Sequence, residues 1–154
     1  MIVLDANILI RAILGRRVRE LIEAYSRRGV RFATPDEAIA DAERHLPALL
    51  KKFSKTDVDI SVSLRYLRLM IEVVDQDLYS AFEADARVRI GNRDEDDWPV
   101  LACALALGCA VWTEDADFFG TGIAVWNTSR IKIFLESEVQ SLSRNPEESS
   151  EGGL

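Results

Sequence analysis

The apolar positions of this chain form short continuous runs that alternate with longer amphipathic segments. Each short run is bounded by Gly, Pro, Asn or an acid, which favours a buried strand. The predicted strands are 1–4, 30–34, 71–74, 109–113 and 123–126. Apolar residues in the other segments recur every three or four positions, as in helices. The predicted helices are 6–14, 17–28, 35–53, 56–69, 78–90, 98–107 and 129–142. This alternation predicts an α/β domain with a central parallel sheet of about five strands and helices on both faces.

Two helix starts carry local signals. Thr34 precedes Pro35, and Glu37 follows three residues after Thr34, a pattern typical of a capping box at a helix N-terminus. Thr56 is the predicted cap of the next helix. The segment 60–64 alternates like a strand as well as fitting a helical face. We interpret it as helix.

Size and composition predict one folded domain. The chain has 154 residues, of which 48% are hydrophobic and 29% charged, so it can bury a core. We expect the domain to span 1–143 and 144–154 to form a flexible acidic tail. Cys103 and Cys109 lie in apolar segments and are expected to be reduced core residues. No apolar run reaches the roughly 18 residues of a membrane span, so we expect a cytoplasmic protein without membrane association.

The charge balance bears on nucleic-acid binding. A net charge of -7 argues against binding driven by bulk electrostatics. Removing the three acids of the last ten residues leaves -4, and a metal bound to clustered acids would offset more. The basic residues that remain for a substrate are Arg11, Arg16, Arg17, Arg19, Arg27, Arg28, Arg31, Lys51, Lys52 and Lys55.

Acidic residues recur at positions where parallel strands and helices meet. Asp5 follows the first strand, the run 94–97 precedes the helix 98–107, and Asp115 and Asp117 follow the fourth strand. The carboxyl ends of parallel strands share one edge of the sheet, so these acids can converge. Clustered carboxylates repel unless a cation lies between them, and Mg²⁺ or Mn²⁺ suits an all-oxygen site. One His in the chain excludes multi-His zinc or iron sites. The pattern therefore indicates metal-dependent phosphodiester chemistry.

This ordered set of acids resembles the PIN-domain nucleases, the family that includes the toxins of VapC-type toxin–antitoxin pairs. The resemblance extends from residue 1 to about residue 136. Its motifs are Leu4-Asp5-Ala6-Asn7, Asp94-x-x-Asp97 before an Ala-rich helix, and Thr113-x-Asp115-x-Asp117-Phe118. The resemblance implies a PIN-like three-layer sandwich and a ribonuclease that uses Mg²⁺ or Mn²⁺ to cut single-stranded or structured RNA. It also implies a homodimer and, if the protein is a toxin, an antitoxin protein as partner.

The resemblance also implies roles for particular residues. Asp5, Asp97 and Asp115 match the catalytic acids that bind metal, with Asp117 as a further ligand or water-mediated support. Asn7 matches the polar residue that steadies the first turn. Thr113 matches the hydroxyl that hydrogen-bonds the first acid.

The second catalytic acid of the family has two candidates here. The family usually has Glu there, six residues after the Pro that opens the helix, and that position is Asp41. Glu43 is the rival, because it lies nearer the predicted buried stripe. That stripe is Ile39, Ala42, Leu46, Leu50 and Phe53.

Two basic side chains near these acids also have alternatives. His45, one turn after Asp41, is either an exposed helix residue or a contact to a substrate phosphate. Arg11, one turn after Asn7, is either a solvated charge or a phosphate contact beside the metals.

Two other functions compete with the nuclease. A non-catalytic PIN-like module that binds RNA or protein would account for the shorter Asp41 and the acidic charge balance. A phosphoryl-transfer enzyme with Asp5 as nucleophile would need a second Asp two residues on, where this chain has Asn7. No Lys stands in a matching place either.

Overall fold

The apolar runs form one parallel sheet in the computed structural model, which describes residues 1–145. The strand order is β3-β2-β1-β4-β5, and every neighbouring pair is parallel. The strands are β1 Ile2–Leu4, β2 Phe32–Pro35, β3 Ile71–Val74, β4 Ala110–Trp112 and β5 Val125–Trp126. The predicted sheet of about five parallel strands is therefore confirmed.

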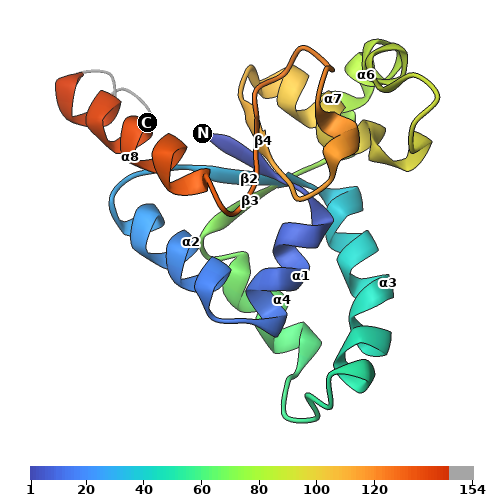
Figure 1. The fold of residues 1–154 in the computed structure, drawn as a ribbon, viewed down its shortest axis with the longest axis vertical. Helices are drawn as coiled ribbons and strands as arrows, with labels where there is room; N and C mark the ends of the chain where they lie inside the picture. The colour runs from blue at the N-terminus through green and yellow to red at the C-terminus, as the bar shows by residue number, and fades with distance from the viewer. Residues whose placement is uncertain (146–154) are drawn as a thin grey trace.

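Helices cover both faces of this sheet (Figure 1). One layer contains α1 Ala6–Leu14, α2 Arg17–Arg27, α3 Asp36–Lys52 and α4 Ile60–Leu67. The opposite layer contains α5 Gln76–Tyr79, α6 Glu83–Ile90 and α7 Trp98–Leu107. Helix α8 Ile131–Arg144 lies beside β5, where Phe134 packs on Trp126 with 5.8 Å between ring centroids. Among the described residues, no helix has both the length and the apolarity to cross a membrane.

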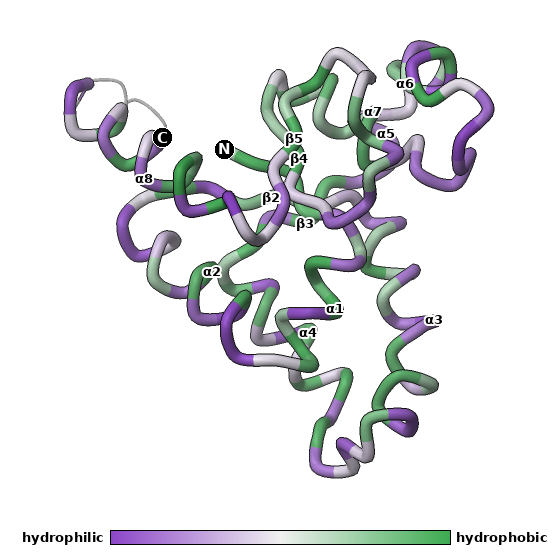
Figure 2. Tube along the Cα trace, in the orientation of Figure 1, coloured by the Kyte–Doolittle hydropathy of each residue, from purple (hydrophilic) through white to green (hydrophobic). Residues whose placement is uncertain are grey.

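The residues of β1 and most of α7 lie in the core. All three residues of β1 are completely buried, and α7 is buried from Pro99 to Ala104. In Figure 2, α7 is coloured mainly as hydrophobic, whereas hydrophobic and hydrophilic positions alternate along α2 and α3. Helix α7 ends at Gly108, which adopts a left-handed φ of 63° that residues with a Cβ rarely tolerate. The chain then turns directly into β4.

The strand order places a topological switch point between β1 and β4. Strands β2 and β3 lie on one side of β1, and β4 and β5 lie on the other. Leu4 is in register with Trp112, and the backbone N–H of Asp5 donates to the Trp112 carbonyl at 3.1 Å. Asp5 and Thr113 therefore leave the sheet side by side, at the place where open α/β sheets bind ligands.

The predicted capping box at Thr34 is wrong. The Thr34 hydroxyl donates to the Leu4 carbonyl at 2.8 Å and so belongs to the sheet. Pro35 occupies the cap position of α3 without a capping side chain, and Glu37 pairs with Arg44 instead. Buried strand residues satisfy their polar groups first, because an unpaired buried hydroxyl is costly.

Two other helices begin at residues different from those predicted. Residues 60–64 are helical, but α4 starts at Ile60 with Asp59 as its cap rather than Thr56. The predicted helix 78–90 begins earlier, at Gln76, and is divided into α5, the 3₁₀ turn Ser80–Phe82 and α6. Of the predicted tail 144–154, residues 146–154 lie outside the described part of the chain.

Candidate metal centre

Asp5 is held by hydrogen bonds at the carboxyl end of β1. Its Oδ1 accepts from the backbone N–H of Ala6 at 2.7 Å. Its Oδ2 accepts from the Thr113 hydroxyl at 2.6 Å and from the Asn7 side-chain amide at 3.1 Å. Burial raises the pKa of Asp5 above its ordinary value, although the Thr113 bond opposes this shift. The carboxylate is therefore fixed in position by the turn itself.

The Thr113 hydroxyl connects the turns after β1 and β4. It donates to Asp5 and accepts from the Asn7 amide at 3.1 Å and from the Asp115 backbone N–H at 3.0 Å. The Asn7 side-chain oxygen in turn accepts from the Glu114 backbone N–H at 3.2 Å. Thr113 is almost completely buried, so this network sets Asp5 and the Asp115 turn relative to one another.

Three carboxylates gather beside Asp5. Asp97, Asp115 and Asp117 each offer an oxygen, and these oxygens all lie within 4.8 Å of one another. Asp97 ends the 3₁₀ turn Glu95–Asp97 that leads into α7, and the other two acids come from the turn after β4. Asp115 accepts a hydrogen bond from the Asp117 backbone N–H at 2.9 Å, which shapes their turn.

Asp97 has an unsatisfied oxygen. It stands at the cap position of α7, but its side chain makes no capping hydrogen bond. Its Oδ2 is buried and has no hydrogen-bond partner among the described residues. Burial raises the pKa of Asp97 to about 8, and the charges of Asp5, Asp115 and Asp94 add to the shift. A buried anion without a partner favours a bound cation.

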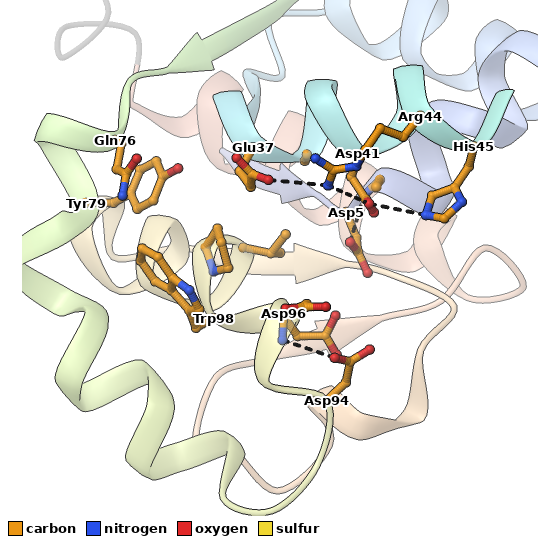
Figure 3. Close-up of a pocket in the computed structure, with 15 residues that line it drawn as sticks. Asp5, Glu37, Asp41, Arg44, His45, Gln76, Tyr79, Asp94, Asp96 and Trp98 are labelled. Atoms are coloured by element: carbon orange, nitrogen blue, oxygen red, sulfur yellow. Dashed lines mark hydrogen bonds and ion pairs between the residues drawn. The ribbon is translucent and has the colours of Figure 1, made fainter.

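The opposite wall of the site comes from α3. A cavity of about 340 Å³ is lined by Asp5 and Asp97 and also by Asp41, Arg44 and His45. Figure 3 shows Asp41 beside Asp5, with the turn that carries Asp94 and Asp96 across the cavity. Asp41 accepts from the Arg44 guanidinium at 3.0 Å and lies 3.3 Å from the His45 Nε2. The cavity thus has a mainly acidic wall and a wall of mixed charge.

The structure also separates the two candidates for the second acid. Asp41 lines the cavity, whereas Glu43 is exposed and does not line it. The predicted buried stripe ends at Leu46, because Leu50 is only partly buried and Phe53 is 54% exposed. Arg11 also lies outside the cavity, with its guanidinium 4.0 Å from the Glu114 carboxylate.

Two arginines at the site had no predicted role. Arg93 donates to the backbone carbonyls of Asp117 and Phe119, and so holds the turn that presents Asp115 and Asp117. Its contact spans the fold and leaves no signal in local spacing. Arg44 was more accessible to prediction, since it lies three residues after Asp41 on one helix.

A comparison with family models bears on this arrangement. A model described as PIN domain matches residues 3–136. This chain belongs to the PIN domain family. Among solved structures, the PIN domain is similar to one described as FitAB bound to an IR36 DNA fragment, with a TM-score of 0.50 and 19% identity. That match covers 82% of this chain and 94% of the other and concerns the fold alone. No curated protein matches the chain.

Proposed function

We propose that this PIN domain is a metal-dependent endoribonuclease that hydrolyses phosphodiester bonds in RNA. The observation that carries the proposal is the trio Asp97, Asp115 and Asp117, whose oxygens lie within 4.8 Å of one another. No Lys or Arg side chain pairs with any of the three within 4.0 Å in residues 1–145. Such a concentration of negative charge supports a cation-binding site.

The donor set fits Mg²⁺ or Mn²⁺. Asp97, Asp115 and Asp117 would hold the ion together with Asp5, and the unpartnered Asp97 Oδ2 is the oxygen most in need of a ligand. All four donors are carboxylates, which hard divalent cations prefer. When bound, such an ion lowers the pKa of a coordinated water and offsets charge on phosphate oxygens.

The chain's own residues position the acids and the substrate. Thr113 and Asn7 hold the Asp5 carboxylate, and Arg93 holds the Asp117 turn. Asp41 and His45 would contact the substrate or its attacking water from α3, where both line the cavity. Arg44 adds a cation on that wall, suited to a phosphate of the bound strand.

A cleavage assay tests the proposal. Short single-stranded RNAs are incubated with the protein in Mg²⁺, Mn²⁺ or EDTA, alongside Asp97→Asn and Asp5→Asn. Glu95→Gln is the matched control, since Glu95 is exposed in the same acidic turn and does not line the cavity. We expect metal-dependent cleavage that both Asp variants lose and the control retains. Cleavage that survives in Asp97→Asn would contradict the proposal.

The pairing of Asp41 favours one competing function. Arg44 and His45 both contact the carboxylate of Asp41, which occupies it in the absence of substrate. A non-catalytic PIN-like module could bind RNA or protein in the cavity while the Asp41 carboxylate stays paired with Arg44 and His45. Calorimetry decides between them: Mn²⁺ binding that requires Asp97 and Asp115 supports the nuclease, and its absence supports the module.

We also propose a homodimer and, as the family resemblance implies, an antitoxin protein whose acids would face or cap the cavity. The FitAB structure, which has a similar fold, is described as bound to a DNA fragment. By analogy, this protein could also act in a complex with a partner. Light scattering during size-exclusion chromatography should return twice the chain mass of 17.3 kDa. A mass near 17.3 kDa would refute the dimer.

A further inference from the structure

A second hollow lies at the junction of α1 and α2. It has a volume of about 390 Å³, and the end of α3 with the segment after it forms its other side. The residues that matter are Arg11, Arg16, Arg17, Phe53, Lys55 and Thr128, which we call the basic hollow. Of the residues that the structure describes, no acidic side chain lines it. In a chain with a net charge of -7, four cations around one hollow form a local exception.

These cations are only weakly neutralised. Arg16 and Arg11 each have a distant carboxylate, at 3.8 Å from Glu20 and 4.0 Å from Glu114. Within residues 1–145, Arg17 and Lys55 have no carboxylate within 4.0 Å. Exposed pairs at such distances contribute little, so the charge stays available to an anion.

Other predicted basic residues are occupied by close ion pairs. Arg28 bonds Glu136 at 2.8 Å, and Arg31 bonds Glu72 at 2.8 Å. Within residues 1–145, Arg27 and Lys51 also have no carboxylate within 4.0 Å, but neither lines the hollow. The hollow is therefore a place where several weakly paired cations gather.

An exposed aromatic ring stands at the same hollow. Phe53 was predicted to be buried in the α3 stripe, but it is 54% exposed. The Lys52 ammonium lies 5.6 Å from its ring centroid and adds another positive charge. A positively charged groove with an accessible aromatic ring is how proteins bind single-stranded nucleic acid without sequence preference. An acidic peptide could also use the cations, whereas a strand of nucleotides in addition offers a base at each step to stack on the ring.

The basic hollow connects to the candidate metal centre through a short chain of contacts. Arg11 lines the hollow and reaches toward Glu114, the residue between Thr113 and Asp115. The Glu114 carboxylate also accepts from the backbone N–H of Thr128, which lines the hollow. A strand that leaves the acids along α1 therefore meets these cations.

We propose that the basic hollow binds the backbone of a single-stranded RNA beside the metal centre, with a base stacked on Phe53. This inference rests on the proposed function, since it names how that substrate is held. The basic hollow would bind and orient the RNA strand, whereas the carboxylates would hold the metal that takes part in hydrolysis.

Fluorescence anisotropy tests the inference with the full chain in EDTA, where no metal-dependent cleavage occurs. The probe is a labelled single-stranded RNA of about 12 nucleotides. The variants are the triple Arg16→Gln/Arg17→Gln/Lys55→Gln and the single change Phe53→Ala. The matched control is the triple Arg65→Gln/Arg68→Gln/Lys132→Gln, which removes the same charge from exposed positions outside the hollow.

We expect the hollow triple to weaken RNA binding by at least about tenfold and to reduce the salt slope by roughly two. Phe53→Ala should weaken binding by on the order of tenfold, and Phe53→Trp should retain it. Unchanged binding in the hollow triple, or equal loss in the control triple, would overturn the inference. Circular dichroism verifies that each variant is folded. An oligo-glutamate peptide that binds as tightly through the same cations would mean that the hollow docks protein and would also overturn it.

Binding without metal separates this inference from the nuclease. Hollow-dependent binding by a protein that never cleaves RNA would reject the proposed function and leave the binding site standing. Cleavage of long RNA that is unaffected in the hollow triple would reject the binding site and leave the nuclease standing.

Discussion

Asp5 and Asp97 face the same cavity but are held in opposite ways. Asp5 accepts from Ala6, Asn7 and Thr113, so protein donors replace the water that burial removes. Asp97 keeps a buried oxygen, Oδ2, that accepts no hydrogen bond from the described part of the chain. Burial raises the pKa of both carboxyls, but only the first has hydrogen bonds that oppose the rise.

This difference gives the two acids different roles, with Asp5 stabilising the local fold and Asp97 serving metal binding. The Asp5 carboxylate joins the turns after β1 and β4, so its loss should disturb the fold locally. The Asp97 Oδ2 accepts no hydrogen bond from the residues that the structure describes, and burial beside other acids raises the pKa of this carboxyl. Residues that stabilise least can matter most for binding a cation.

The largest expected effect is the loss of RNA cleavage in Asp97→Asn. Cleavage should fall by more than about 100-fold, since even residues that only orient ligands cost 10–100-fold. The melting temperature in EDTA should stay equal or rise, because Asn is neutral at every pH and needs no bound proton to be buried. Asp5→Asn should lose as much activity but have a lower melting temperature. If Asp97→Asn melts as early as Asp5→Asn, the comparison fails.

Thr113→Val should have the next largest effect. It removes the hydroxyl that serves Asp5, Asn7 and Asp115, and leaves their polar groups buried without that partner. We expect a loss of about 1–3 kcal/mol in the free energy of unfolding, measured by urea denaturation. Thr113→Ser keeps the hydroxyl and should lose much less. Equal losses in the two variants would show that the methyl group, and not the network, stabilises this turn.

Arg93→Met should affect metal binding without a large effect on the fold. The change frees the carbonyls of Asp117 and Phe119, so the turn that carries two acids becomes less ordered. We expect Mn²⁺ affinity to fall by about tenfold in calorimetry. The free energy of unfolding should stay within about 0.5 kcal/mol, as for other surface changes. Arg68→Met, at an exposed position on another face, should change neither quantity.

The last prediction concerns pH. The folded pKa of Asp97 is about 8 against an ordinary 3.8, so the native state holds this proton more tightly than the unfolded chain. Its contribution to stability is complete below pH 3.8 and is lost as pH rises through about 8. In EDTA, wild type should lose stability relative to Asp97→Asn as pH rises toward 8, and each kcal/mol lost lowers the melting temperature by about 2–4 °C.

A divalent cation should reverse this loss in wild type only. Thermal denaturation at acidic, neutral and alkaline pH, with and without Mn²⁺, measures it. A difference between the two proteins that stays constant with pH would argue against an elevated Asp97 pKa.

Much of the fold was accessible from the pattern of residues. Short runs rich in apolar residues and bounded by turn residues predicted every strand of the sheet. Strands β1 and β4 are buried at every residue and apolar throughout, as strands covered on both faces are. The acids that follow β1 and β4 were found by position alone, since parallel strands end at one edge. The predicted cap at Thr34 was wrong because the Thr34 hydroxyl donates to the distant Leu4 carbonyl. The predicted cap at Thr56 was wrong because Asp59, three residues later, caps α4.

The sequence by itself determined the strand–helix alternation, the family and the identity of the acids near the sheet edge. Only the tertiary structure decided that Asp41 rather than Glu43 lines the cavity, and that Phe53 is exposed. It alone showed that the buried Asp97 Oδ2 has no hydrogen-bond partner within residues 1–145 and that Arg93 holds the Asp117 turn. The physical reason is that burial, pairing and charge repulsion depend on distances in space. Residues far apart in the chain set those distances, and no local pattern records them.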